Sequence, residues 1–236
     1  MVRLMGIVNL TPDSFFEPSR MPVSEVVPRV RRMMESGVSI VDLGAVSTRP
    51  GAVEVGLEEE WSRLEPALTV LSSMKDRPEL SIDTERSEII RRAVGIVGPV
   101  TVNDISSGEF DPGMLPLAGR MGLRFIAMHK RGGPRTMDGL CDYPSGVIPA
   151  LLDYFRDFGH RASESGVQDW ILDPGLGFAK TPRQCWEILY RLEELSVLGR
   201  PVLIGAADKR FTEGNTALAH AVAILHGADI LRIHCR

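Results

Sequence analysis

The chain has 236 residues, of which 44% are hydrophobic and 25% charged, and its formal net charge is −4. These values are typical of a folded soluble protein with a sizeable core, and they exclude a disordered chain. The acidic balance argues against a dedicated nucleic-acid binder, and the lack of an apolar run of about 20 residues argues against a membrane span. The N-terminus lacks the features of a secretion signal. Three separated cysteines form no CxxC pair, so we expect a reduced, cytoplasmic protein without a disulfide framework or a zinc knuckle.

Short apolar runs alternate with amphipathic segments along the whole chain. Eight runs are typical of strands buried on both faces, at residues 4–8, 40–43, 80–82, 100–102, 124–127, 170–172, 202–204 and 230–233. Seven segments with helical spacing lie between them, at 23–36, 57–73, 85–94, 113–121, 146–165, 182–195 and 214–226. Strict alternation of strand and helix predicts a parallel sheet, and eight strands favour a closed (β/α)8 barrel over an open sheet.

The whole chain, residues 1–236, reads as one such barrel, because no linker or low-complexity segment interrupts the alternation. The chain stops three residues after the last predicted strand. We therefore expect the eighth outer helix to be missing and the barrel to be uncovered beside its first and last strands. Burial of that apolar surface predicts self-association, most simply as a homodimer.

Polar side chains follow all eight predicted strands. In a (β/α)8 barrel the active site forms where the strands end, at their C-terminal face. The residues found there are Asn9, Asp42, Asp83, Asn103, the run Met128-His129-Lys130, Asp173, the pair Asp208-Lys209, and Arg232 with His234, which point to the same side because they are two apart. Their convergence predicts a polar ligand site at one mouth of the barrel.

The chemistry of these side chains suggests the ligand. The carboxylates and amide of Asp83, Asn103 and Asp173 suit a flat heterocycle rich in N–H donors. Arg232, His234 and Lys209, together with Arg49 on a loop, suit a phosphate or diphosphate. Asn9 and Asp42 offer oxygen atoms to a hard cation such as Mg²⁺, which often binds to the phosphates of a substrate.

Simpler explanations exist for several of these features. An aspartate or asparagine after a strand often only caps the next helix, and Asp173-Pro174-Gly175 has the composition of a plain turn. The glycine-rich run at 175–180 resembles a phosphate loop only weakly. The run Glu58-Glu59-Glu60 is typical of a solvated helix start. Surface or packing roles are expected for the helical histidines (His160, His220 and His226), and Cys141 and Cys185 are expected to be inert.

Several long motifs, in a fixed order, resemble those of the dihydropteroate synthase family. They are Met-Gly-Ile-Val-Asn-Leu-Thr-Pro-Asp-Ser-Phe at 5–15, Ser-Thr-Arg-Pro-Gly at 47–51, Ser-Ile-Asp-Thr at 81–84, Val-Asn-Asp at 102–104, Asp-Pro-Gly-Leu-Gly-Phe at 173–178 and Arg-Ile-His at 232–234. The resemblance runs from Met5 to His234. It implies a TIM barrel that joins 6-hydroxymethyl-7,8-dihydropterin diphosphate to p-aminobenzoate and releases diphosphate, in folate biosynthesis.

The resemblance also implies roles for individual residues. Asp83, Asn103, Asp173 and Lys209 would hold the pterin, and Met128 would line the substrate site. Asn9, Arg232 and His234 would bind the diphosphate, with Asn9 also facing Mg²⁺. A loop with Thr48, Arg49 and Pro50 would close over p-aminobenzoate, whose pocket Phe178 would line. The groups expected to assist the chemistry directly are Lys209, Arg232, His234 and Arg49.

The sequence departs from the family pattern on the p-aminobenzoate side. The usual Ser-Arg-Lys after the seventh strand is Ala207-Asp208-Lys209 here, so a hydroxyl and a guanidinium are lost and a carboxylate is gained. The stretch before the Ser-Thr-Arg-Pro-Gly motif is Gly44-Ala45-Val46, the usual Asp-Gly-Gly after the first loop is Glu17-Pro18-Ser19, and the acid usual after the Arg-x-His motif is Cys235. We expect an intact pterin half and an altered p-aminobenzoate half.

Three hypotheses follow. The first is an active dihydropteroate synthase. The second is a catalytically impaired paralogue that binds pterin or a folate-pathway partner. The third, a methyltetrahydrofolate-dependent methyltransferase domain, is disfavoured because methyl transfer has no use for diphosphate-binding residues. Retention of Arg49, Arg232 and His234 favours the enzyme over the impaired paralogue.

Overall fold

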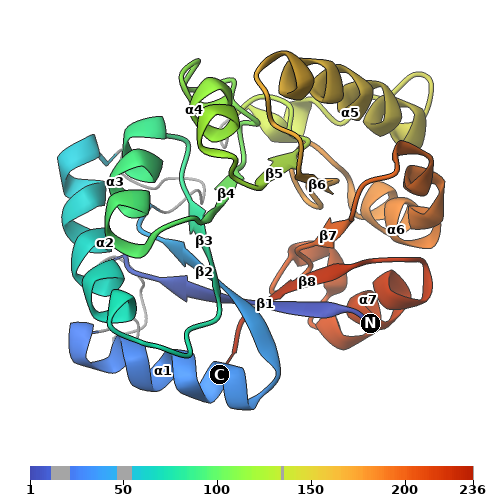
Figure 1. Ribbon diagram of the computed structural model, residues 1–236. Helices are drawn as coiled ribbons and strands as arrows, with labels where there is room; N and C mark the ends of the chain where they lie inside the picture. Colours follow the sequence, from blue (N-terminus) through green and yellow to red (C-terminus); the bar gives the residue numbers. More distant parts are fainter. Residues whose placement is uncertain (12–21, 47–54, 134–135, 236) are drawn as a thin grey trace.

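The eight predicted strands form one parallel sheet that curls into a barrel (Figure 1). The computed structural model describes residues 1–11, 22–46, 55–133 and 136–235. The strands are β1 (Arg3–Asn9), β2 (Val38–Gly44), β3 (Glu79–Asp83), β4 (Thr101–Asp104), β5 (Phe125–Met128), β6 (Trp170–Asp173), β7 (Leu203–Ile204) and β8 (Ile230–Ile233). Their order around the sheet is β6-β5-β4-β3-β2-β1-β8-β7. The predicted (β/α)8 fold is confirmed.

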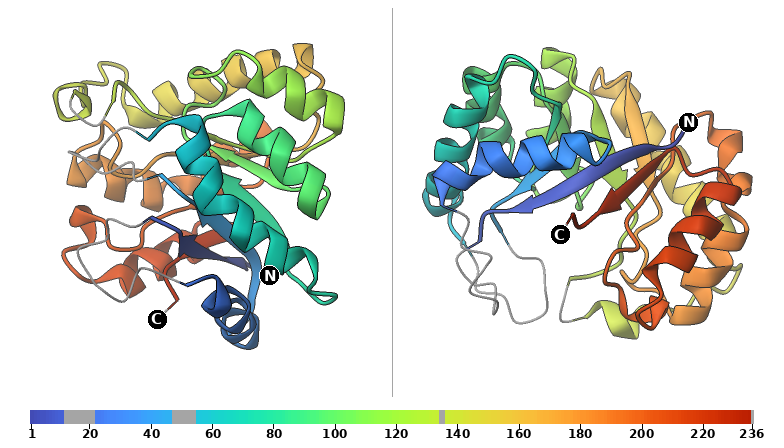
Figure 2. Two further views of the ribbon diagram at one scale, coloured as in Figure 1. Left: turned by 90° about the vertical axis from the view of Figure 1, so that its left-hand side faces the viewer. Right: turned by 90° about the horizontal axis from the view of Figure 1, so that it is seen from below.

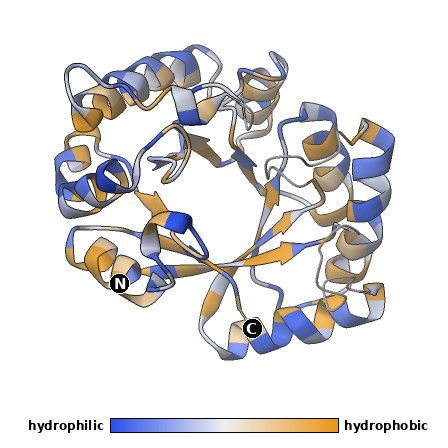
Figure 3. Ribbon diagram, turned by 180° about the vertical axis from the view of Figure 1, so that it is seen from behind, coloured by the Kyte–Doolittle hydropathy of each residue, from blue (hydrophilic) through white to orange (hydrophobic). Residues whose placement is uncertain are grey.

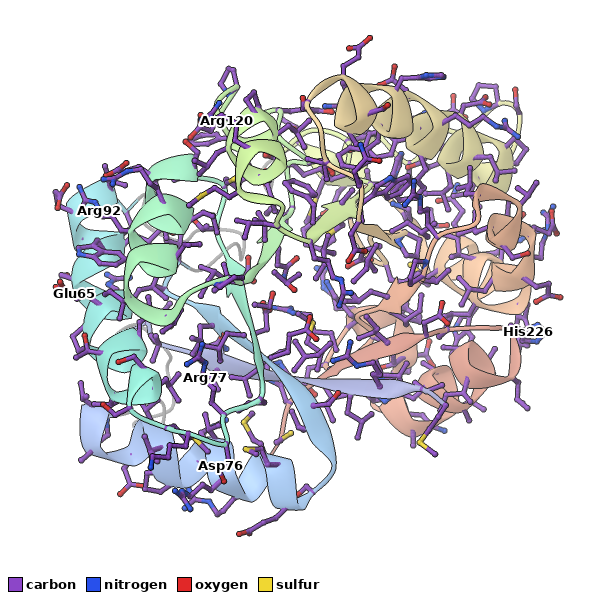
Figure 4. All side chains as sticks on the ribbon, viewed as in Figure 1. Glu65, Asp76, Arg77, Arg92, Arg120 and His226 are labelled. Carbon is purple, nitrogen blue, oxygen red and sulfur yellow. The ribbon has the colours of Figure 1, made fainter. Side chains whose placement is uncertain are left out.

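The helices lie outside the barrel, one after each of the first seven strands (Figure 1). They are α1 (Val23–Glu35), α2 (Leu57–Ser72), α3 (Ser87–Val97), α4 (Met114–Met121), α5 (Val147–Glu164), α6 (Pro182–Tyr190) and α7 (Thr216–Leu225). Charged side chains such as Glu65, Arg92 and Arg120 lie on their outer surfaces (Figure 4). Within the described ranges, no helix is long and apolar enough to cross a membrane.

The barrel closes at a narrow seam between β6 and β7. Every other neighbouring pair of strands forms a ladder of two or more residue pairs, but here the closure consists of one bridge between Leu172 and Val202. The Leu172 amide also donates a hydrogen bond to the Pro201 carbonyl at 3.0 Å. The strands on the two sides of this seam lead to Asp173 and Lys209, so the seam runs up to the candidate site.

Alternation of side chains along each strand produces two cores. Outward-facing residues pack under the helices, in a cluster with three large buried rings from Phe125, Phe155 and Phe158. Inward-facing residues fill the middle of the barrel with one apolar layer, formed by Met5, Ile40, Ile126, Ile171, Leu203 and Ile230. Figure 3 shows the apolar strands at the centre and the polar residues concentrated on the outer helices. The filled layer makes the barrel a closed cup.

Below this layer, at the N-terminal ends of the strands, four charged residues form an ion-pair network. Glu79 accepts hydrogen bonds from Arg3 at 2.7 Å and from Arg124 at 3.0 Å. Arg124 also donates to Asp169 at 2.7 Å. Two arginines therefore balance two carboxylates at the bottom of the barrel.

Two sequence predictions about helices were wrong. The segment predicted as a helix over 182–195 begins at a capping box, in which Thr181 accepts from the Gln184 amide, but its α-helix ends at Tyr190 and a 3₁₀ helix over Leu192–Leu198 follows. The acidic start of α2 is not wholly solvated, because Glu60 is fully buried. Its carboxylate pairs with Arg86 and accepts from the Thr84 hydroxyl at 2.5 Å. The hydroxyl and guanidinium that follow β3 therefore draw this glutamate inward.

The surface beside β1 and β8 is less regular than the rest of the helix ring. Helices α1 and α7 flank these two strands (Figure 2), and no helix follows β8 within the described residues, as expected. The outer face of α7 is apolar, with Leu218, Ile224 and Leu225 exposed.

Candidate active site

An arginine between two carboxylates lies at the C-terminal end of the barrel. The Arg232 guanidinium donates to Asp42 Oδ2 at 2.7 Å and to Asp83 Oδ2 at 2.8 Å. The amide of Asn103 donates to the same Asp42 oxygen at 3.0 Å. Strands β2, β3, β4 and β8 each supply one of these inward-facing side chains. One cation thus serves two acids.

The two carboxylates differ in their surroundings. The Asp42 side chain is fully buried, and its second oxygen, Oδ1, has no hydrogen-bond partner within the part of the chain that the structure describes. Asp83 is partly open to the mouth. Burial raises the pKa of Asp83 to about 7; Arg232 opposes this, while the charges of Asp42, Asp104 and Glu85 add to it. Near neutral pH Asp83 therefore exchanges between a proton donor and a pure acceptor.

The ends of β6 and β7 supply a second acid and a second cation. Asp173 Oδ1 accepts from the Gly175 amide at 2.8 Å, so part of this carboxylate forms the predicted turn. Burial raises the pKa of Asp173, whereas the nearby charges of Lys209 and Arg232 lower it. The Lys209 ammonium lies 4.3 Å from the centre of the Phe178 ring, a cation–π contact. Burial lowers the pKa of Lys209, and Asp173 opposes that shift.

The rim of the site carries Asn9, Asp208 and His234. Asn9 is exposed at the end of β1, where its backbone pairs with Gly44 of β2. His234 Nε2 lies 3.8 Å from Asp208 Oδ2, an ion pair when the imidazole is protonated. Asp208 has a φ of 55°, in the left-handed region that asparagine and aspartate tolerate better than most residues.

Most of the predicted site residues converge as expected. One cup is lined by acids, an amide and cations, from Asp83, Asn103, Asp173, Lys209 and Arg232. Met128 is buried beside this cup, at the end of β5. Asn9 and His234 lie at the rim. Thr48, Arg49 and Pro50 lie outside the described residues.

The structure places the acids and the cations of the predicted site next to one another. Arg232 is bonded directly to Asp42 and Asp83, and Lys209 lies near Asp173. Like charges repel in a partly desolvated cup, so the fold interleaves opposite charges. One oxygen of Asp42, Oδ2, accepts from both Arg232 and Asn103.

Three other candidates have structural roles. Asp104 accepts from the Ser106 and Gly108 amides, at 2.7 and 2.8 Å, and so forms the turn after β4. His129 is buried, and its Nδ1 is bonded to Lys180. In the glycine-rich run, the Gly175, Gly177 and Phe178 amides donate to Asp173, Cys185 and Gly175 respectively, so they are not available to a phosphate.

Two features could not be read from the sequence. Asp42 joins Arg232 to Asn103, but its partners are 190 and 61 residues away. Lys180 is buried against His129, 51 residues away. The only sequence signal for Lys180 was its place at the end of a glycine-rich run.

A polar cup at the C-terminal face of a (β/α)8 barrel defines a small-molecule enzyme of this fold class. The family profile described as pterin binding enzyme matches residues 5–234. Dihydropteroate synthase of Synechocystis sp. is 38% identical over 98% of this chain, which covers 84% of that protein. The chain belongs to the dihydropteroate synthase family of pterin binding enzymes.

Two further relatives show the extent of the match. The crystal structure of dihydropteroate synthase from Thermus thermophilus in complex with 4-aminobenzoate is 35% identical, with a TM-score of 0.83, and the alignment covers 99% of this chain and 88% of that one. The folic acid synthesis protein fol1 of Pneumocystis carinii is 38% identical over 98% of this chain. The chain spans only 34% of that longer protein.

Proposed function

We propose that this protein is a dihydropteroate synthase, which joins 6-hydroxymethyl-7,8-dihydropterin diphosphate to p-aminobenzoate and releases diphosphate. The observation that carries the proposal is the set of acids, amide and cations at one barrel mouth, in a chain of this family. Asp83, Asn103 and Asp173 provide acceptors for the N–H groups of a pterin, and the Lys209 ammonium provides a donor to its ring.

The cations assist departure of the diphosphate. As the carbon–oxygen bond to the diphosphate breaks, negative charge grows on the leaving group and positive charge grows on the pterin. Arg232 and His234 are positioned to stabilise the negative charge on the diphosphate. The carboxylates of Asp83 and Asp173 are positioned to stabilise the positive charge on the pterin. The aromatic amine then attacks the carbon, so no carboxylate nucleophile is required. Fixed charges of this kind contribute roughly 3 kcal/mol each to lowering a barrier.

Magnesium fits this site in a limited way. Among the described residues, no group of three or more histidines, cysteines or acids could enclose a metal ion. Mg²⁺ keeps several waters and commonly binds one protein oxygen together with substrate phosphates, and the exposed Asn9 carboxamide offers one such oxygen. When bound, the ion would supply charge neutralisation to the diphosphate, and Asn9 would hold it.

The p-aminobenzoate side contains Phe178 and, by family resemblance, the segment with Thr48, Arg49 and Pro50. The Asp208 carboxylate is exposed on this side, where it repels the carboxylate of the substrate. We expect a high KM for p-aminobenzoate with an otherwise functional pterin site.

The test is a turnover assay. Purified protein is mixed with the pterin diphosphate, Mg²⁺ and labelled p-aminobenzoate, and the labelled product and released diphosphate are measured. Equal amounts of both are expected. Diphosphate release without labelled product would favour a different second substrate, and tight pterin binding without any release would favour the catalytically impaired paralogue, the alternative that Asp208 supports.

We also propose a homodimer and a reduced cytoplasmic location. The exposed apolar residues Leu218, Ile224 and Leu225 on α7 support self-association, and sedimentation showing a monomer at micromolar concentration would contradict it. The described cysteines, Cys141, Cys185 and Cys235, are all free thiols, in keeping with a reducing compartment.

A further inference from the structure

A buried lysine behind the site has no role in the chemistry described above. The Lys180 side chain is 6% exposed, between the loop after β6 and the start of α6. Its ammonium group donates to Phe178 O at 2.9 Å, to His129 Nδ1 at 2.9 Å and to His129 O at 3.3 Å. All three N–H groups have partners, but none of these partners is a carboxylate.

The imidazole of His129 is fixed by this arrangement. While Lys180 is protonated its ammonium group only donates, so in that state His129 Nδ1 accepts and the ring proton lies on Nε2. Burial lowers the pKa of His129 to about 3, with the charges of Lys180 and Arg131 adding to the shift. The edge of the ring meets Tyr154 at a centroid distance of 4.9 Å, so the acceptor cannot easily rotate away.

Burying this lysine is costly. Desolvation lowers the pKa of Lys180 to about 7; the charge of Asp173 opposes this shift, and that of Arg131 adds to it. An ammonium group without a carboxylate partner lowers stability relative to an apolar side chain of the same volume. A role other than stability is therefore needed to explain it.

Lys180 joins two loops that carry site residues. The His129 amide donates to the Asp173 carbonyl at 3.0 Å, and a Cβ on Gly175 would lie 2.1 Å from the His129 oxygen. The backbones of the loops that follow Met128 and Asp173 are thus in direct contact. Lys180 bonds to both loops at once.

The loop after β6 has a strained backbone next to Lys180. Ala179 has a φ of 51°, a conformation that costs an ordinary L-residue about 1 kcal/mol or more. The Tyr143 hydroxyl donates to the Ala179 carbonyl at 3.0 Å, and Lys180 holds the adjacent Phe178 carbonyl. The Phe178 ring, which contacts Lys209, is attached to the Cα directly before the first of these two anchored carbonyls in the chain.

We propose that Lys180 is a positioning residue: through its hydrogen bonds to His129 and Phe178 it holds the strained loop after β6, and so places the Phe178 ring against Lys209 on the p-aminobenzoate side of the site. The inference rests on the proposed function for its substrates. Loss of Lys180 should therefore weaken the use of the aromatic amine, p-aminobenzoate, more than it weakens binding of the pterin.

The test replaces Lys180 by methionine, which has a similar length and no donor. In the Lys180→Met enzyme we expect the KM for p-aminobenzoate to rise about tenfold or more, the Kd for pterin diphosphate to stay within about threefold, and the Tm to be unchanged or higher. Lys75→Met, an exposed lysine on the turn before β3, is the matched control and should behave as the wild type.

The outcomes separate the possibilities. A lower Tm, or failure of Lys180→Met to fold, would assign Lys180 a structural role and overturn the proposal, as would an unchanged KM. A second variant, His129→Phe, keeps the ring contact with Tyr154 but removes one acceptor, and a smaller KM rise in the same direction is expected; no rise would also count against the proposal. If the wild type forms no product, the proposed function fails instead, so the two failures are distinguishable.

Discussion

The two ends of the barrel both contain arginine–carboxylate networks, but their charge balance differs. At the N-terminal end, Arg3 and Arg124 balance Glu79 and Asp169. At the C-terminal end, Arg232 pairs with both Asp42 and Asp83. Among the described residues, the bottom network has one arginine for each carboxylate, whereas the top one has one arginine for two carboxylates and an Asp42 oxygen, Oδ1, with no hydrogen-bond partner. A completed network stabilises the fold, and an incomplete one is suited to a ligand.

Removal of the top arginine tests this contrast with the largest expected effect. In Arg232→Met two carboxylates remain in the cup without their cation, and we expect the free energy of unfolding to fall by about 3 kcal/mol. Arg3→Met is the control, because its side chain is 38% exposed and loss of such a pair costs less than about 1 kcal/mol. Urea unfolding measures both, and equal losses would contradict the proposed difference between the two ends.

Loss of charge at Asp173 is expected to have the next largest effect. Asp173→Asn keeps a side-chain oxygen for the Gly175 amide but removes the negative charge beside the pterin. A charged hydrogen bond contributes about 1.5–3 kcal/mol, so the Kd for pterin diphosphate should rise roughly 10- to 100-fold. Asp169→Asn, which lies just before β6 at the opposite end of the barrel, should leave the Kd unchanged. If calorimetry gave the same Kd for Asp173→Asn as for the wild type, Asp173 would not be a pterin-binding residue.

The two ends should also respond oppositely to pH. The folded-state pKa of Asp83 is raised to about 7 from its ordinary 3.8, so between these values the folded protein holds a proton that the unfolded chain has released. Stability therefore falls as pH rises through this window, by at most about 1.4 kcal/mol per pH unit. Asp83→Asn should flatten this slope in urea unfolding measured from pH 4 to 8; an unaltered slope would contradict the assignment.

Glu79 should make stability depend on pH with the opposite sign. Its burial alone would raise its pKa, but the hydrogen bonds from Arg3 and Thr101 and the charges of Arg3 and Arg124 outweigh burial and lower it. Its stabilising contribution is present above its ordinary pKa and is lost as pH falls below it. Glu79→Gln should therefore reduce the loss of stability in acid and leave the slope near neutral pH intact.

The smallest expected effect concerns the rim. Asp208→Arg replaces a carboxylate by a guanidinium on the p-aminobenzoate side, and an exposed charge pair contributes up to about 1 kcal/mol. The KM for p-aminobenzoate should fall by about three- to fivefold. Asp208→Asn, which removes only the repulsion, should have a smaller effect in the same direction. A steady-state KM that stays flat or rises in Asp208→Arg would remove this explanation of the altered motif.

Sequence patterns predicted the fold well because strand burial and helix amphipathicity are local properties. All eight apolar runs became strands, and Asp83, Asp173 and Arg232 followed from their position at strand ends. Partners could not be predicted in the same way. Whether Asp42 faces a metal or Arg232, and whether Asp104 binds a ligand or forms a turn, depends on contacts made only after the barrel closes.

The sequence also did not predict which charged residues are buried. Glu60 looks like its neighbours Glu58 and Glu59 in the sequence, yet only Glu60 is fully buried, because Arg86 and Thr84 follow β3 beside it. Likewise Lys180 resembles any lysine after a glycine-rich turn. Charged residues become buried only where distant partners supply hydrogen bonds, and one sequence does not reveal that pairing.

The narrow closure between β6 and β7 determines where local motion can widen the cup. A ring of strands opens where it has the fewest cross-links, and here that place separates the strand leading to Asp173 from the strand leading to Lys209. Amide protons along this join should exchange with solvent faster than those of the other seven ladders. Widening there changes the spacing between Asp173 and Lys209, while the Arg232 centre, built on β2, β3, β4 and β8, is not divided by the seam.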